Sequence, residues 1–352
     1  MNKRPLLYIL VSASLFGASP PLAKMLVREV PPVVLAGLLY FGAFLGLSAY
    51  SFGEMILLKG PGEKRAFLEG RDYLWLAGTI LSGGIIAPIN LLFGLERVSG
   101  FAASLLLNLE GVLTAVIAVF LFGESAGKRL WLALACVTVA GLFLMWEPVQ
   151  GKFNLTGPLL IVIAMAAWGM DNNLTRHISG KDPVQIARIK GLVSGIVSLG
   201  LGFLFGMRID WDAHIIYALL LGSFSYGISL VFFIKALEGF GSFRTGLFFG
   251  FAPFISAVTS LILLREWLGW VMFPATGLMA VGLWLMIEER HSHLHVHEEM
   301  THTHLHDHEE IHHRHKHAGT TQEPHVHKHM HPGGSHAHAH WPDTHHRHEH
   351  EP

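Results

Sequence analysis

The chain has 352 residues, of which 51% are hydrophobic and only 14% are charged. A soluble protein of this size carries about a quarter charged residues, so the composition argues against a cytosolic enzyme. The single cysteine, Cys136, lies in an apolar run and excludes both a disulfide scaffold and a CxxC zinc site.

Charges and histidines are divided unevenly along the chain. Residues 1–290 carry 21 Lys or Arg and 17 Asp or Glu. Residues 291–352 carry 4 and 9 of these, and they hold 23 of the chain's 25 histidines. We therefore expect two parts, an apolar body and a histidine-rich tail.

The body contains ten apolar runs, and each is close to the length of about 20 residues that a membrane-spanning helix needs. A β-barrel would show short alternating strands instead of unbroken runs, and one soluble domain would have to bury all ten. A cleaved signal peptide is disfavoured because Pro20-Pro21 and Lys24 stand where small residues are expected. The sequence predicts an all-α integral membrane protein with spans at 5–24, 33–53, 72–95, 99–122, 130–147, 154–175, 184–206, 214–237, 243–264 and 267–288.

The charges of the short loops predict the orientation. Loops on the side of the two termini hold twelve Lys or Arg, against six on the opposite side. Positively charged loops stay in the cytoplasm. We therefore expect a multi-pass protein of the prokaryotic inner membrane with both termini, and hence the tail, in the cytoplasm.

The two halves of the body repeat each other. Residues 5–147 and 154–288 each hold five predicted spans, and an odd number makes the second half enter the membrane from the other side, as an inverted repeat. One block of identities has a constant offset of 152, and a second block has an offset of 142. The matches are Phe16-Gly17, Leu22 and Pro31 with Trp168-Gly169, Leu174 and Pro183, and then Leu95-Glu96, Ala115-Val116 and Glu124 with Leu237-Glu238, Ala257-Val258 and Glu266.

These features resemble the EamA-type branch of the drug/metabolite transporter (DMT) superfamily. The segments LNLEG (107–111) and WGMDNNLTR (168–176) look like a bacterial branch whose members often end in histidine-rich tails. The resemblance implies a carrier that exports or imports a small solute without ATP hydrolysis, not an enzyme, and it requires no cofactor. The sequence has no GxxxxGK[ST] phosphate loop, which agrees with this implication.

Glu110 is the most deeply placed ionisable residue of the body. Ionisable groups at bilayer depth are costly and are candidates for function. Glu110 lies about 13 residues from Arg97 and 14 from Glu124, which is ~20 Å from either end of the helix at 1.5 Å per residue. We expect it to line the solute path or couple transport to protons. The alternative is a structural ion pair with Arg188 or Lys190.

A second polar group, Asp171-Asn172-Asn173, closes the sixth predicted span, and Arg188 and Lys190 lie at the start of the seventh. An acid-amide cluster opposite two cations would bind a zwitterion, coordinate a cation or form a salt-bridge gate, whereas polar residues at helix ends are often only solvated or capping. Pro20-Pro21, Pro88 and Pro253 are expected to interrupt or kink their helices, while Glu124 and Glu266 are expected to be structural. The predicted solute path comprises Asn90, Asn108, Glu110, Asp171, Asn172, Asn173, Arg188 and Lys190.

The tail alternates histidine with other residues. Alternate residues of an extended chain project to the same side, so each HxH pair can present two imidazoles to one ion. Imidazole suits Zn(II), Ni(II), Co(II) and Cu(II). With few apolar residues, the tail is expected to be disordered without metal. The predicted ligands are His291, His293, His295, His297, His302, His304, His306, His308, His325, His327, His329, His331, His336, His338 and His340.

Three functions remain open from the sequence. The first, slightly favoured because of the tail, is a carrier for a divalent transition metal or its complex, although the spans hold few metal ligands. The second is an amino-acid or metabolite exporter whose tail only regulates, and the third is a metal sensor or store without transport. The expected partners are the lipid bilayer, a small solute, Zn(II), Ni(II) or Co(II) at the tail, and a second copy of the chain. No nucleic acid is expected.

Overall fold

The computed structural model describes most of the body and four segments of the tail. The described residues are 4–57, 66–122, 128–145, 155–207, 212–236, 249–266, 269–270, 272–287, 291–297, 300–306, 325–331 and 334–340.

The described body is helical throughout. The first half contains α1 (Arg4–Gly17), α2 (Ser19–Leu26), α3 (Pro32–Leu57), α4 (Asp72–Thr79), the π-helix η1 (Ile80–Ile86), α5 (Ala87–Leu95), α6 (Gly100–Leu106), α7 (Leu109–Phe122) and α8 (Lys128–Met145). The second half contains α9 (Thr156–Thr175), the 3-10 helix η2 (Arg176–Ile178), α10 (Pro183–Leu204), α11 (Ala213–Leu221), the π-helix η3 (Gly222–Ile228), α13 (Ala252–Leu264) and α14 (Met272–Ile287).

Among the described residues, six helical stretches are long and apolar enough to cross a membrane. They are Leu6–Leu26, Pro32–Gly53, Asp72–Leu95, Gly100–Phe122, Pro183–Leu204 and Ala213–Ala236. Shorter apolar helices cover Trp131–Gly141, Ala252–Leu264 and Met272–Gly282, and α9 adds 20 residues. The all-α class predicted for the body is confirmed, while the number of ten spans stays a prediction.

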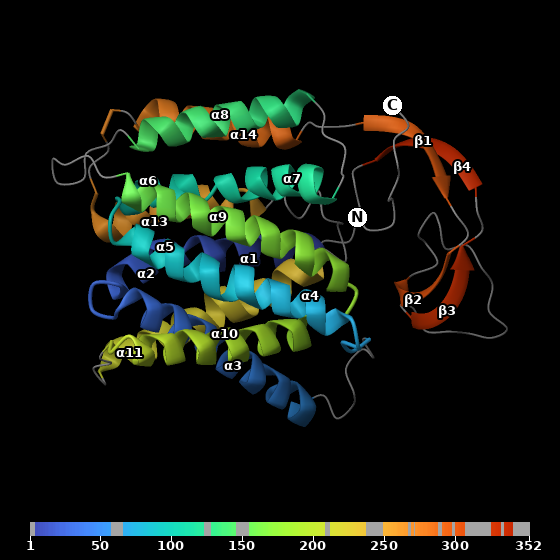
Figure 1. Cartoon of the computed structure of the whole chain (residues 1–352), viewed down its shortest axis with the longest axis horizontal. Helices are drawn as coiled ribbons and strands as arrows, with labels where there is room; N and C mark the ends of the chain where they lie inside the picture. The colour runs from blue at the N-terminus through green and yellow to red at the C-terminus, as the bar shows by residue number, and fades with distance from the viewer. Residues whose placement is uncertain are drawn as a thin grey trace.

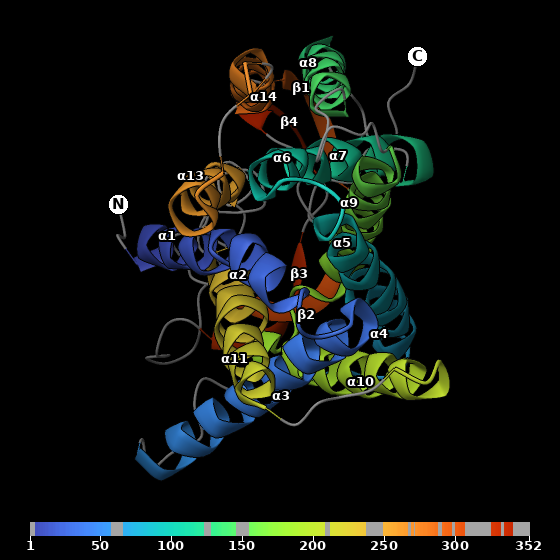
Figure 2. The same cartoon turned by 90° about the vertical axis from the view of Figure 1, so that its left-hand side faces the viewer.

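The helices run side by side between two ends of the bundle (Figure 1). At one end, which we call the Lys24 end, Lys24 Nζ donates to the carbonyl of Leu95 at 2.6 Å, so α2 meets the end of α5. At the other, the His177 end, the His177 ring stacks on Trp75 with centroids 4.0 Å apart, so η2, which follows α9, meets α4. Figure 2 looks along the bundle from the Lys24 end and shows α8 and α14 packed together at its periphery.

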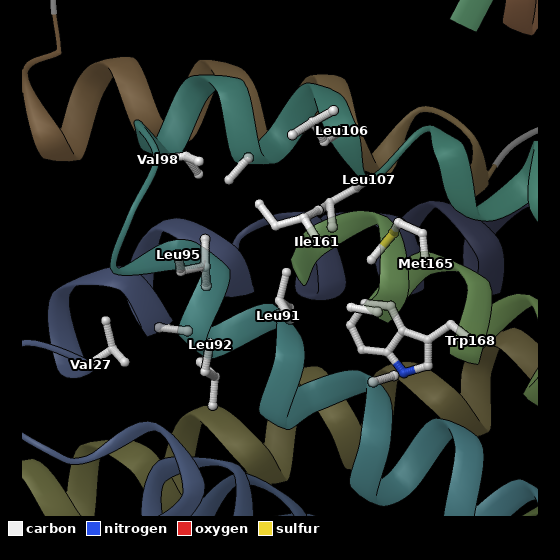
Figure 3. Packing of buried hydrophobic residues seen from close by; sticks show 14 of the residues in the cluster. Val27, Leu91, Leu92, Leu95, Val98, Leu106, Leu107, Ile161, Met165 and Trp168 are labelled. Carbon is white, nitrogen blue, oxygen red and sulfur yellow. The ribbon is translucent and has the colours of Figure 1, made fainter. Parts of the chain in front are cut away.

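Glycines let α3 and α10 approach each other closely. A Cβ at Gly191 of α10 would lie 2.8 Å from the Tyr40 carbonyl oxygen, and one at Gly195 would lie 2.8 Å from the Phe41 nitrogen. Small residues at a helix interface are the usual means of close packing in membranes. The helical stretch Asp72–Leu95 packs on α3, α10 and α9. Figure 3 shows Leu91 of α5 beside Ile161 of α9, with Trp168 further along α9.

The predicted prolines mark helix starts. Pro20 and Pro21 lie in the first turn of α2, which begins just after α1 has ended at Gly17. Pro88 lies in the first turn of α5, directly after η1, and Pro253 lies in the first turn of α13. Proline is tolerated in the first turn of a helix because the N–H that it lacks would have no partner there. Pro88 differs, because it lies inside the continuous helical stretch Asp72–Leu95, directly after its π-helical turn.

The two π-helices occupy equivalent positions in the two halves. Ile80 and Gly222, at their starts, are 142 residues apart, as are Ile86 and Ile228 at their ends. This is the offset of the second block of sequence identities. Pro88 cannot cause both, because the residue that corresponds to it beyond η3 is Leu230.

The tail contains regular structure where disorder was predicted. β1 (His291–His297) pairs antiparallel with β4 (Gly334–His340), and β2 (Met300–His306) pairs antiparallel with β3 (His325–His331). The prediction of a disordered tail is therefore wrong for these four segments. The prediction rested on low apolar content, whereas strict alternation of residue types is itself the pattern of a β-strand.

Candidate functional site

A buried ion pair joins α9 to α10. Lys190 Nζ lies 2.5 Å from Asp171 Oδ2, and the side chains of Lys190 and Asp171 are 7% and 10% exposed. Asp171 continues the buried face of α9 that includes Met165 and Trp168, three or four residues apart. Lys190 likewise lies on the buried face of α10. Both charges are therefore held inside the bundle and satisfied by each other.

The ion pair packs against the π-helix η1. A Cβ at Gly83 would overlap the Asp171 carboxylate, and one at Gly84 would overlap the Ser194 hydroxyl, so only glycine fits at these two positions. The Gly83 carbonyl accepts hydrogen bonds from Tyr40 Oη at 2.5 Å and from Trp168 Nε1 at 3.1 Å. π-Helical turns are frequent at functional sites, and this one brings α3, α9 and α10 to one point.

Glu110 is bound by the amide that follows the ion pair. Asn172 Nδ2 donates to Glu110 Oε1 at 2.9 Å and to Thr114 Oγ1 at 3.2 Å. Asn173 Nδ2 donates to the Thr114 carbonyl at 2.9 Å. Among the side chains that the structure describes, Glu110 thus bonds to an amide of α9, and the alternative ion pair with Lys190 or Arg188 is not formed.

The Asp171–Lys190 pair and Glu110 both lie near the middle of membrane-spanning helices. Gly83, which contacts Asp171, is the twelfth of the 24 residues of Asp72–Leu95. Glu110 is the eleventh of the 23 residues of Gly100–Phe122. The polar site of an inverted-repeat carrier is expected at this depth.

The remaining predicted path residues are not part of this cluster. Asn90 Nδ2 donates to the carbonyl of Ile86 at 2.7 Å, and Asn108 Nδ2 donates to that of Leu105 at 3.1 Å, so each bonds to its own stretch of chain. Arg188 Nε is buried and, among the described atoms, has no hydrogen-bond partner. A role for these three residues stays a prediction.

An aromatic cluster borders the polar site, and only part of it could be predicted from the sequence. Phe16 meets Trp168 at 5.8 Å and Tyr226 at 6.2 Å, and Tyr226 meets Tyr40 at 5.4 Å between ring centroids. Phe16 and Trp168 were noted as repeat partners. Tyr40 and Tyr226 were missed, because single tyrosines in apolar runs have no distinguishing pattern.

The charged residues of the ion pair occur in one half only. The residues at the offset of 152 from Asp171 and Lys190 are Ser19 and Leu38, neither of which is charged. The position of Glu110 likewise corresponds, at the offset of 142, to Ala252. The charges of the polar site therefore have no counterparts at the offset positions.

A second charged group lies at the Lys24 end and was not predicted as a site. Lys24 Nζ donates to the carbonyls of Leu95 and Val98, and both carboxylate oxygens of Glu266 accept from the N–H groups of Gly100 and Phe101 at 2.7 and 2.8 Å. Glu266 thus caps α6, which agrees with the structural role expected for it, whereas Glu124 lies outside the described residues. The sequence signal for Lys24 was a cation next to an apolar run. Lys24 and Glu266 also line a pocket of about 700 Å³. Its lining residues are Lys24, Val27, Arg28, Leu95, Glu96, Val98, Ser99 and Glu266.

Candidate metal ligands are absent from the bundle but aligned in the tail. In the described part of the helical body, no three His, Cys, Asp or Glu side chains are grouped to hold a metal ion. In the tail, His297 opposes Gly334, His331 opposes Met300, and His308 lies outside the described residues. The other twelve predicted ligands oppose one another in the pairs His291–His340, His293–His338, His295–His336, His302–His329, His304–His327 and His306–His325.

Known proteins similar to the chain include a transporter family and a protein named as a transporter. Residues 3–146 and 155–288 each match the EamA-like transporter family. An uncharacterized transporter of Methanothermobacter thermautotrophicus is 28% identical over 269 residues, which are 73% of this chain and 78% of that protein. An uncharacterized protein of Pseudomonas aeruginosa is 28% identical over 180 residues, covering 50% of this chain and 61% of its own length. A solved crystal structure with 18% identity aligns over 79% of this chain and 94% of that one with a TM-score of 0.57, so the fold is shared.

Proposed function

Because the chain belongs to the EamA-like transporter family of the DMT superfamily, we propose that it is a secondary carrier whose two halves expose the Asp171–Lys190 site to each side of the membrane in turn. Members of this family are multi-pass membrane transporters of small solutes and not enzymes. We further propose that the chain crosses the inner membrane ten times, in two inverted repeats, with both termini in the cytoplasm. The matching positions of η1 and η3 support the repeat.

The buried ion pair is the observation that carries the proposed solute class. Breaking a buried pair by removing one partner costs about 3–5 kcal/mol, so the empty carrier keeps Asp171 and Lys190 together. A zwitterionic solute replaces each partner without loss of pairing, with its carboxylate on Lys190 and its cationic group on Asp171. Trp168 and Tyr40, which share the Gly83 carbonyl, offer aromatic surface for its apolar part. Amino acids and related metabolites have this chemistry.

Counterflow in proteoliposomes tests the proposal. Vesicles loaded with an amino-acid mixture should exchange at least one component in the presence of the protein. Asp171→Asn and Lys190→Met should each slow this exchange by about tenfold or more, because each leaves one buried charge unpaired. The double variant, which removes both charges, should regain thermal stability but not exchange.

A surface pair provides the control. Lys181 and Asp72 lie 3.1 Å apart with side chains 25% and 21% exposed, and exposed pairs contribute at most about 1 kcal/mol. Lys181→Met should therefore leave exchange intact. Exchange at the normal rate in both Asp171→Asn and Lys190→Met would overturn the ion-pair site.

The second candidate function is transition-metal handling through the tail, and the aligned histidine pairs favour it. The described body lacks a cluster of metal ligands. We therefore propose that the tail binds Zn(II), Ni(II) or Co(II) and regulates the carrier. In the alternative, the bound metal is itself the transported solute. Counterflow with these three ions separates the two, because a regulatory tail predicts that none of them moves. Unchanged metal tolerance of cells that express residues 1–290 alone would count against both roles.

A further inference from the structure

We infer that the pocket at the Lys24 end is a second solute site, in which the carboxylate of a solute binds to Lys24 and Arg28. The inference rests on the proposed function for the zwitterionic solute and goes beyond it, because neither residue belongs to the Asp171–Lys190 site. The pocket of about 700 Å³ falls within the range of about 300–1,000 Å³ that is usual for small-molecule sites. It therefore has room for a solute of the size of an amino acid.

Lys24 contributes a buried ammonium group with one hydrogen-bond donor to spare. The residue is 8% exposed, and its Nζ donates to the carbonyls of Leu95 at 2.6 Å and Val98 at 2.5 Å. An ammonium group carries three donors, and within the described part of the chain no carboxylate forms an ion pair with it. Glu96 and Glu266 attract it only from beyond that distance. A buried charge without a close partner is costly, so a ligand carboxylate would complete the surroundings of Lys24.

Arg28 is the second cation of the pocket and lies just beyond the end of α2. It is exposed, and it lines the pocket together with Lys24. Its guanidinium forms no hydrogen bond or ion pair with any residue that the structure describes. A guanidinium presents its donors as a planar fork that matches a carboxylate. The pocket thus combines an ammonium group and a guanidinium fork, neither of which is paired with a carboxylate of the described chain.

The two acids of the pocket are already bonded within the chain. Glu96 Oε2 accepts from Arg97 at 2.8 Å, and the two oxygens of Glu266 accept from the N–H groups of Gly100 and Phe101. The charged groups left uncommitted in the pocket are therefore the two cations, which favours an anionic group of the solute. A carboxylate can accept about four hydrogen bonds, so the two acids can also receive a solute ammonium group. The pocket thus suits a zwitterion.

The pocket is too far from the Asp171–Lys190 pair for one solute to occupy both. Lys24 contacts Leu95, whereas Asp171 packs on Gly83, twelve residues earlier in the same helical stretch. Twelve helical residues span about 18 Å, and a single extended residue spans about 3.6 Å. The pocket is therefore a separate site. In the proposed orientation, it lies where the solute enters or leaves on the side opposite the cytoplasm.

Chemical protection of Arg28 tests the site in the full-length protein in phosphatidylcholine nanodiscs. Phenylglyoxal modifies exposed arginines, and mass spectrometry reports the modification of each one. An amino-acid mixture without arginine should slow the labelling of Arg28, by about tenfold at ten times the Kd, because only unoccupied sites react. Arg265 is exposed at the same end and does not line the pocket. The ratio of Arg28 to Arg265 labelling therefore corrects for reagent that the mixture consumes.

Two variants separate this site from the central one. Lys24→Met should abolish the protection of Arg28 by the mixture. The double variant Asp171→Asn with Lys190→Met should retain the protection although it does not exchange solute. Protection without counterflow in the unaltered protein would overturn the proposed function and leave this site standing. Counterflow without protection would overturn this site alone.

A lipid headgroup is the other source of an oxyanion at the end of the bundle. Nanodiscs that contain phosphatidylglycerol supply its phosphate in the absence of the mixture. Protection of Arg28 by this lipid, with none by the mixture, would assign the pocket to lipid and overturn the solute site. An unchanged ratio of Arg28 to Arg265 labelling under both conditions would also overturn it. Both results come from the unaltered protein, so neither depends on the folding of Lys24→Met.

Discussion

Phe16 and Trp168, which hold equivalent positions in the two halves of the chain, meet edge to face with their ring centroids 5.8 Å apart. The glycines that follow them behave in parallel, since a Cβ at Gly17 would lie 2.6 Å from the Ala252 carbonyl oxygen and one at Gly169 would lie 2.9 Å from the Thr114 nitrogen. Thus α1 of the first half packs on α13 of the second half, and α9 of the second half packs on α7 of the first half. The two repeats are interlocked around the aromatic contact, next to the polar site.

The close approach of Gly83 to Asp171 predicts a strong effect of one methyl group. Gly83→Ala would place a Cβ on the carboxylate, and overpacking of this kind typically costs about 1–3 kcal/mol. We expect a lower melting temperature in detergent and loss of counterflow. The control is Gly200→Ala in the same bundle, where a Cβ meets nothing within 4 Å. It should lower neither the melting temperature nor the rate of counterflow. Equal behaviour of the two variants would contradict the packing of Asp171 on η1.

Neutralising Glu110 should separate a role in transport from a role in folding. Glu110→Gln retains the oxygen that accepts from Asn172 Nδ2, so the melting temperature should change little, while transport should be abolished. Glu96→Gln, at an exposed ion pair with Arg97, serves as the control and should transport normally. Normal transport by Glu110→Gln would assign Glu110 to the structural role that the sequence left open.

The cap on α6 makes a prediction about stability. Hydrogen bonds to a charged group contribute about 1.5–3 kcal/mol, and both Glu266 oxygens accept from backbone N–H groups at the start of α6. Glu266→Ala should lower the melting temperature in detergent by several degrees, and Glu266→Gln, which keeps one acceptor oxygen, should lower it by less. Similar melting of the two variants would show that the carboxylate does not stabilise the helix.

The two ends of the bundle should face opposite sides of the membrane. Glu29 is exposed beyond Lys24, and Gly180 is exposed beyond His177. In a Cys136→Ser background, an impermeant maleimide added to intact cells should label Glu29→Cys but not Gly180→Cys. Labelling of Gly180→Cys alone would reverse the proposed orientation, and labelling of both would contradict a single orientation.

The sequence was informative where a pattern recurs along one helix or between the halves. Apolar runs predicted the helical body, and prolines predicted the interruption after Gly17. The offset of 142 seen in the sequence recurs in the positions of η1 and η3. The sequence was less informative where two elements meet. The pairing of Asp171 with Lys190, and not of Glu110 with Lys190, depends on how η1 admits a carboxylate at Gly83, which no single-helix pattern contains. The tail shows the same limit, because alternation was visible but the strand partners were not.

The absence of charge at Ser19 and Leu38, the counterparts of Asp171 and Lys190, has an energetic consequence. In a carrier made of two identical inverted halves, the inward-open and outward-open forms would be related by a twofold rotation and would have equal free energy. An ion pair supplied by one half alone removes that degeneracy, so the unloaded protein should rest with one face closed.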